Sequence, residues 1–166
     1  MNNTRVKHTT CKADMHVHSR YSRDPSVWVL RKMGCAESYT DPQYLYQSMK
    51  NRGMDLVTIT DHDTIDGNLE IAHLPDTFIS EEVTASFPGD GCKVHVLVYD
   101  INEKQHQDIT RLRENVFELV QFLHTEEIFH ALAHPMYSVD GGLKVEHFQQ
   151  LLLLFTHFEL NGARDN

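Results

Sequence analysis

Histidine residues occur at three points of the sequence where a strand is expected to end. His16 and His18 lie in the stretch DMHVH, His62 lies in TDHD, and His134 lies in AHP. Residues i and i+2 of a strand point to the same face, so His16 and His18 can face one spot and bind a metal ion together. An HxH pair alone is weak evidence, because 12 of the 166 residues are histidine.

Two further candidates lie inside expected strands. Glu82 lies in FISEEVT, and His95 lies in KVHVLVY, where a buried strand would normally prefer an apolar residue. Each position has an ordinary structural explanation: Glu82 as an exposed acid, His95 as a hydrogen-bonded core residue, and Asp61 as a helix cap. Buried carboxylates are costly unless they are paired or bound to metal, so the repeated occurrence of such residues favours a shared site.

The hydrophobic pattern alternates between strands and helices. A helix is expected after Thr40 or Asp41, with Gly53 at its exit, and a long amphipathic helix over 109–123. Strands are expected at 55–60, 76–86, 92–100, 128–135 and 157–162, and a further helix at 144–155. This order predicts an α/β fold with a mostly parallel sheet, in which sites form at the carboxyl ends of the strands.

Composition places the chain among single-domain proteins of the cytoplasm. A chain of 166 residues that is 40% hydrophobic and 23% charged is long enough for one domain, which we expect to span 1–166. No stretch is long and apolar enough for a membrane span or a signal peptide. Three cysteines without a CxxC motif fit a reducing compartment, and the formal charge of −9 argues against a broad nucleic-acid surface.

The candidate ligands are imidazoles and carboxylates without thiolates. This donor set suits Zn, Mn or Fe in a hydrolytic site better than a structural zinc site. A carboxylate can bridge two cations, and two such cations can activate water and neutralise a phosphoryl group. Phosphoester hydrolysis is therefore the chemistry that these residues favour.

The ordered set DMHVHSRYSRD, TITDHDT, EEVT, VHVLVYD and AHP resembles the PHP (polymerase and histidinol phosphatase) superfamily over nearly the whole chain. The resemblance implies a distorted, TIM-like, seven-stranded β/α barrel. It also implies two or three divalent metal ions, Zn, Mn, Fe or Mg, and hydrolysis of phosphate esters by a metal-bridging hydroxide.

The resemblance also implies which residues bind these metals. His16 and His18 would bind one metal with Glu82 as a bridge, and Glu82, His95 and His134 would bind the second. Asp24 and His62 would bind a third. Asp61 matches less securely and is expected to orient an imidazole.

The end of the chain departs from the family pattern. The family closes with an Asp-x-His pair on a late strand, and no such pair follows residue 134. We therefore expect a domain that is incomplete at its C-terminus and lacks its last β/α units. Exposed strand edges would then favour self-association or pairing with a missing segment.

Three arginines are candidates for binding the substrate phosphate, because guanidinium groups pair with phosphate oxygens. Arg20 and Arg23 lie beside the HxH motif, and Arg164 follows the last expected strand. The expected substrate is a phosphorylated small molecule, a nucleotide or an oligonucleotide end. Two alternatives stay open: a metal-binding or regulatory PHP domain without turnover, and a metal-dependent amidohydrolase, which would usually need a bridging lysine.

Overall fold

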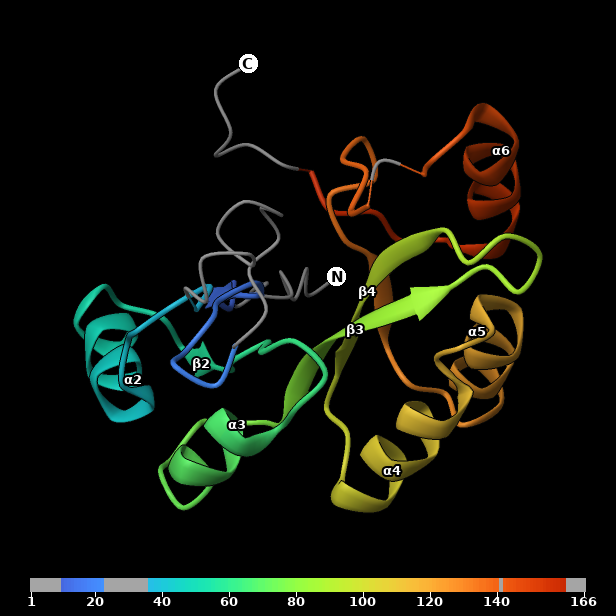
Figure 1. Cartoon of the computed structure of the whole chain (residues 1–166). Helices are drawn as coiled ribbons and strands as arrows, with labels where there is room; N and C mark the ends of the chain where they lie inside the picture. Colours follow the sequence, from blue (N-terminus) through green and yellow to red (C-terminus); the bar gives the residue numbers. More distant parts are fainter. Residues whose placement is uncertain (1–9, 23–35, 141, 161–166) are drawn as a thin grey trace, which may run out of the picture.

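The structure is a computed structural model, and it describes residues 10–22, 36–140 and 142–160 (Figure 1). In chain order, the elements are β1 (Ala13–Asp14), α2 (Pro42–Asn51), β2 (Leu56–Val57), α3 (Asp66–Ile71), β3 (Ser80–Ser86), β4 (Lys93–Tyr99), α4 (Glu103–Leu112), α5 (Val116–Thr125), β5 (His130–Leu132) and α6 (Val145–Leu154).

The strands form two small sheets that differ in direction. β1 and β2 make a two-stranded parallel sheet, and β3, β4 and β5 make a three-stranded antiparallel sheet in that order. Isolated parallel bridges join Val57 to Thr77 and His62 to Glu82, so the chain that follows β2 runs beside β3. A further bridge joins Leu132 to Phe158, where the sequence predicted a complete strand.

The predicted seven-stranded, TIM-like barrel is wrong. The described residues form no closed barrel, and β3, β4 and β5 are antiparallel rather than parallel. For β3 and β4 the reason is the short connection over residues 87–92, where Gly91 adopts a positive φ of 74°. Two strands joined by so few residues form a hairpin, since a parallel crossover needs a dozen or more.

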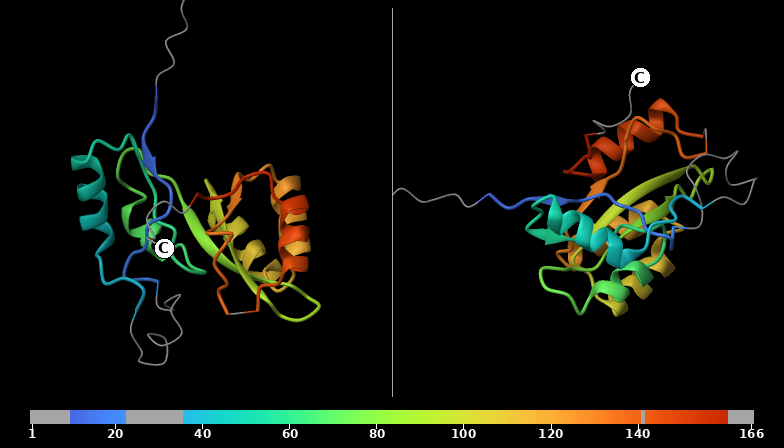
Figure 2. Two further views of the ribbon diagram at one scale, coloured as in Figure 1. Left: turned by 90° about the horizontal axis from the view of Figure 1, so that it is seen from above. Right: turned by 90° about the vertical axis from the view of Figure 1, so that its left-hand side faces the viewer.

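The β3–β4 hairpin separates an apolar face from a polar face. On one face, Val83, Val96 and Val98 pack in the main core against α4, α5 and α6. Figures 1 and 2 show these three helices beside the hairpin, while α2 and α3 lie at the other end of the molecule. The opposite face carries Glu82 and His95 and is left for the candidate site.

Two helices replace the single long helix predicted over 109–123. α4 ends at Leu112, and Asn115 then begins α5 by accepting a hydrogen bond from the Phe117 N–H with its side chain. The apolar period continues across this break because both helices pack on the same core. None of the helices in the described part of the chain is long and apolar enough to cross a membrane.

The N-cap of α2 was predicted and is confirmed. The Asp41 carboxylate accepts hydrogen bonds from the N–H groups of Gln43 and Tyr44, and Pro42 occupies the first turn. We expect Asp41→Ala to lower the free energy of unfolding by about 1 kcal/mol, because two N–H groups lose their acceptor. Asp41→Asn keeps a capping oxygen and should cost less. Denaturant unfolding of both variants measures the difference, and equal losses would contradict the capping role.

Candidate metal centre

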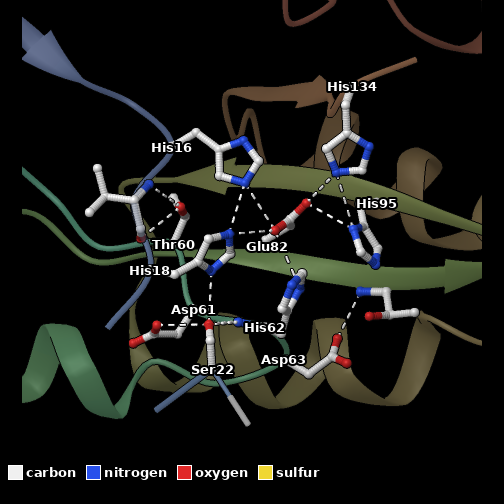
Figure 3. Close-up of polar contacts among 12 residues, drawn as sticks. His16, His18, Ser22, Thr60, Asp61, His62, Asp63, Glu82, His95 and His134 are labelled. Atoms are coloured by element: carbon white, nitrogen blue, oxygen red, sulfur yellow. Dashed lines mark hydrogen bonds and ion pairs between the residues drawn. The ribbon is translucent and has the colours of Figure 1, made fainter. Parts of the chain in front are cut away.

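The buried carboxylate of Glu82 lies at the centre of a histidine cluster (Figure 3). Its Oε2 atom lies 3.0 Å from His16 Nε2, 3.1 Å from His18 Nε2 and 3.3 Å from His62 Nδ1. One carboxylate oxygen therefore faces three imidazole nitrogens.

The other carboxylate oxygen of Glu82 faces a second pair of imidazoles. Its Oε1 atom lies 2.9 Å from both His95 Nδ1 and His134 Nε2, and these two nitrogens are 3.3 Å apart. Each oxygen of Glu82 thus has its own set of nitrogen donors, which is the arrangement that a bridging carboxylate requires.

The structure brings together six of the seven predicted ligands: His16, His18, His62, Glu82, His95 and His134. The seventh, Asp24, lies outside the described residues. Two groups have donor atoms close enough to share one ion: His16, His18 and Glu82, and His62, Glu82 and His95. His134 lies as close to Glu82 as His95 does and offers another donor for the second group.

The HxH segment is held in place through the residue between its histidines. The N–H of Val17 donates to Thr60 Oγ1 at 2.9 Å, and the Val17 carbonyl accepts from the Thr60 N–H at 2.7 Å. Beyond the ends of β1 and β2, the two chain segments therefore stay side by side as far as Val17 and Thr60. With the Val17 side chain packed against the α2 and α3 core, His16 and His18 project together toward Glu82.

A buried network around Asp61 sets the protonation of His18. Asp61 accepts hydrogen bonds from the N–H and hydroxyl of Ser19 and from the hydroxyl of Ser22. Because the Ser22 proton is donated to Asp61, His18 Nδ1 must donate to Ser22 Oγ, 2.8 Å away. In the neutral tautomer that this hydrogen bond favours, Nε2 of His18 is the nitrogen without a proton, and it faces Glu82. Asp61 therefore orients an imidazole through Ser22 rather than by direct contact.

Glu159 has the equivalent role for His16, and sequence reasoning missed it. Glu159 Oε1 lies 2.8 Å from His16 Nδ1, and Glu159 Oε2 accepts from the backbone N–H of His134 at 2.8 Å. Its signal was present: Glu159 lies in HFELNG, a stretch expected to be a strand on the same rim as the histidines.

If the rings of His16 and His18 were both neutral, three unprotonated atoms would meet at one point. With Nδ1 of His16 and of His18 donating outward, their Nε2 atoms face each other at 3.1 Å and both face Glu82 Oε2. Three acceptors at this distance repel unless a positive charge lies among them. Hydrogen bonds that fix a ligating imidazole from its far nitrogen are typical of metal sites.

The pKa shifts show the same need for positive charge. Burial lowers the pKa of His16, but its hydrogen bonds with Glu159 and Glu82 outweigh burial and raise it to about 10. Burial raises the pKa of Glu82, yet the hydrogen bonds with the surrounding histidines hold it well below its usual range. A proton on His16 can thus supply the positive charge that a metal ion would supply.

His62 and His134 each have a buried nitrogen without a hydrogen bond. Burial, together with the charges of neighbouring histidines, lowers the pKa of His62 to about 3 in spite of the attraction of Glu82, so the ring is neutral. Nδ1 of His62 and Nδ1 of His134 have no hydrogen-bond partner. For His62, a neutral ring whose unpartnered Nδ1 faces Glu82 fits the requirements of a divalent metal ion.

Backbone contacts fix the remaining members of the cluster. The chain after β2 pairs with β3, because the Asp63 N–H donates to the Glu82 carbonyl and the Glu82 N–H donates to the Asp61 carbonyl. Asp63 has a positive φ of 56°, and His134, after β5, has a φ of 27°. Non-glycine residues adopt such values infrequently, and they cluster at functional sites.

The predicted phosphate-binding arginines do not reach the cluster in the described residues. The guanidinium of Arg20 pairs with Asp41 and with Glu70, the latter at 2.7 Å, on the exposed side of the molecule. Arg23 and Arg164 lie outside the described residues. Their role in phosphate binding therefore stays a prediction.

Two solved structures resemble this fold. One is an amidohydrolase from Chromobacterium violaceum with bound sulfate and no metal, with a TM-score of 0.59 and 12% identity over 86% of this chain and 72% of that one. The other, from Bifidobacterium adolescentis, is described as a proposed metal-dependent phosphoesterase; its TM-score is 0.52 at 12% identity, over 90% of this chain and 77% of that one. At this identity the likeness shows a shared fold, which also occurs in proteins described as hydrolases.

Sequence comparison finds a partial match to an uncharacterized protein of Methanocaldococcus jannaschii. The two are 36% identical over 75 residues, which is 45% of this chain and 42% of the relative. The chain thus spans about two fifths of the length of this curated relative. No protein-family model matches the chain.

Removing the charge of Glu82 should weaken metal binding. We expect Glu82→Gln to raise the Kd for Mn²⁺ or Zn²⁺ at least tenfold, because the carboxylate faces both donor sets. Titration calorimetry and elemental analysis of the purified chain provide the measurement.

Glu81→Gln is the matched control for Glu82→Gln. Glu81 is the neighbouring buried acid of β3, but its side chain contacts His106 at 2.9 Å, away from the cluster. This variant should keep its metal, and equal metal contents in the two variants would rule out the cluster as the binding site.

A methyl group at Gly67 should disturb the Asp61 network. A Cβ at this position would overlap Asp61 Oδ2 and lie 2.8 Å from Ser19 Oγ, whereas a Cβ at Gly89 would meet nothing within 4 Å. We expect Gly67→Ala to destabilise the chain by about 1–3 kcal/mol and to weaken metal binding. Gly89→Ala, the control, should change neither. Unchanged metal affinity in Gly67→Ala would show that Asp61 does not support the cluster.

Proposed function

We propose that this protein is a metal-dependent phosphoesterase whose centre is the histidine cluster around Glu82. The observation that carries the proposal is the convergence of imidazole nitrogens on both oxygens of one buried carboxylate. Such a donor set, without thiolates, suits two divalent ions in a hydrolytic site. Zn, Mn and Fe are the candidates, and their number and identity are part of the proposal.

When bound, the divalent ions would activate a water molecule for attack on phosphorus and stabilise the charge that develops on the phosphoryl oxygens. The chain itself supplies the rigid donor set. Glu82 presents one oxygen to each group of imidazoles, while Asp61 and Glu159 keep His18 and His16 in the tautomers that direct Nε2 inward. The preformed orientation reduces the rearrangement that metal binding and turnover require.

Support for phosphate as the substrate group comes from the structural neighbours. The Chromobacterium violaceum structure contains sulfate, which has the tetrahedral shape and charge of phosphate. The Bifidobacterium adolescentis neighbour is itself described as a proposed metal-dependent phosphoesterase. We propose a phosphorylated small molecule, a nucleotide or an oligonucleotide end as the substrate of this chain.

A metal-dependent amidohydrolase is the second candidate, and the likeness to a protein described as an amidohydrolase favours it. In the described cluster the bridging group is Glu82, and no lysine contacts the imidazoles. This donor set favours the phosphoesterase proposal over an amidohydrolase that uses a carboxylated lysine.

Phosphatase activity against p-nitrophenyl phosphate tests the proposal. We expect hydrolysis that depends on added Mn²⁺ and falls at least a hundredfold in the His16→Ala/His18→Ala variant, because two inward-facing donors are lost. The control is His73→Ala, an exposed histidine outside the cluster, which should keep full activity.

Two results would contradict the proposal in different ways. Activity that survives the double change would exclude the cluster as the catalytic centre. Metal bound to the cluster without hydrolysis of any phosphate ester would instead indicate a metal-binding domain without turnover.

A further inference from the structure

A polar pocket of about 210 Å³ opens directly beside the histidine cluster. His62 and His95 line it at the end nearest Glu82, and Ser86, Lys93 and Arg113 line it farther away. No aromatic side chain other than the two histidines lines it among the described residues. The pocket therefore suits a polar group attached to whatever binds at the cluster.

The register of the hairpin explains why the pocket continues from the cluster. Thr84 lies opposite His95, and Ser86 lies opposite Lys93. The second pair is two residues closer to the turn of the hairpin than the first. Alternate residues share a face, so Lys93 lies on the same face as His95, about 7 Å along the strand. A substrate whose phosphoryl group is at the cluster can extend along this face toward Lys93.

Arg113 forms the second cationic wall of the pocket. Its guanidinium pairs with Asp63 Oδ1 at 2.7 Å, and its carbonyl accepts from the Ser86 N–H at 2.9 Å. Asp63 Oδ1 also accepts from the Thr84 N–H at 2.7 Å. Asp63 thereby holds Arg113 in place while the guanidinium keeps further N–H groups for a ligand.

The charges that line the pocket differ in their partners. The ammonium group of Lys93 makes no ion pair with another described residue, so its charge is available to a ligand. Of the two acids that line the pocket, Asp63 is occupied by Arg113 and by Thr84, and Glu114 is exposed. Lys93 and Arg113 thus give the pocket two cationic groups, and Glu114 is the acid in its lining that no described cation neutralises.

We propose that this pocket binds the alcohol portion of the substrate, and that Lys93 and Arg113 select phosphate esters that carry a second anionic group, a carboxylate or a phosphate. The proposal rests on the proposed phosphoesterase function of the neighbouring cluster. It makes Lys93 and Arg113 specificity-determining residues, and it requires an anion a few bonds away from the ester phosphate.

Equilibrium binding to the Mn²⁺-loaded full chain tests the selectivity. The ligands are 3-phosphoglycerate, glycerol 1-phosphate and ethanolamine phosphate, which differ in carrying a second anion, a neutral group and a cation. We expect 3-phosphoglycerate to bind about tenfold more tightly than glycerol 1-phosphate, since charge-assisted contacts are the strong ones. Where hydrolysis is measurable, kcat/KM should show the same order.

Lys93→Gln is the decisive variant, because Lys93 is exposed and its loss should leave the fold intact. It should remove most of the preference for 3-phosphoglycerate. Lys144→Gln is the control: Lys144 is a nearby exposed lysine that pairs with Asp90 at 3.0 Å and does not line the pocket. It should keep the preference.

Three outcomes would overturn the inference: equal binding of the three ligands, tighter binding of ethanolamine phosphate through Glu114, or a preference that Lys93→Gln leaves unchanged. None of them depends on turnover. A chain that prefers 3-phosphoglycerate through Lys93 but hydrolyses no phosphate ester would support the pocket and contradict the phosphoesterase proposal, so the two failures are distinguishable.

Discussion

The burial of the Glu82 carboxylate is the constraint on which this structure depends. An ionised carboxylate removed from water is costly unless positive charge or hydrogen-bond donors surround it. Glu82 is almost completely buried, and imidazoles from four separate parts of the chain supply its surroundings. The HxH segment, the chain after β2, β4 and the end of β5 therefore all meet at this one carboxylate.

The β3–β4 hairpin lets one pair of strands serve both the core and the site. Its alternation directs valines into the core beneath α4, α5 and α6, and it directs Glu82, Thr84 and His95 to the opposite face. The same face continues into the pocket that Lys93 and Arg113 line. A single register thus places the cluster and the pocket in a fixed relation to each other, so the proposed chemistry and the proposed specificity have one structural origin.

Asp61 was expected to orient an imidazole, but the route of its hydrogen bonds and the role of Glu159 were harder to foresee than the cluster. Asp61 orients the ring of His18 through Ser22. Glu159, which follows His16 by 143 positions in the sequence, orients the ring of His16 directly. Serines and glutamates are common surface residues, so their types carry little information about such a role. The likeness to two solved structures at 12% identity shows that a fold of this kind persists while most of its sequence changes.

The sequence by itself predicted most of the residues that meet, because histidines and an acid that recur in and at the ends of expected strands are hard to explain without a common partner. The order of those residues was enough to predict a cluster of His16, His18, His62, Glu82, His95 and His134. Tertiary structure decided how the strands assemble: alternating strands and helices suggested a mostly parallel barrel, but β3, β4 and β5 form an antiparallel sheet, of which only the β3–β4 hairpin can be read from the short turn after Ser86. It also decided which nitrogen of each ring faces inward, since that depends on partners distant in the chain.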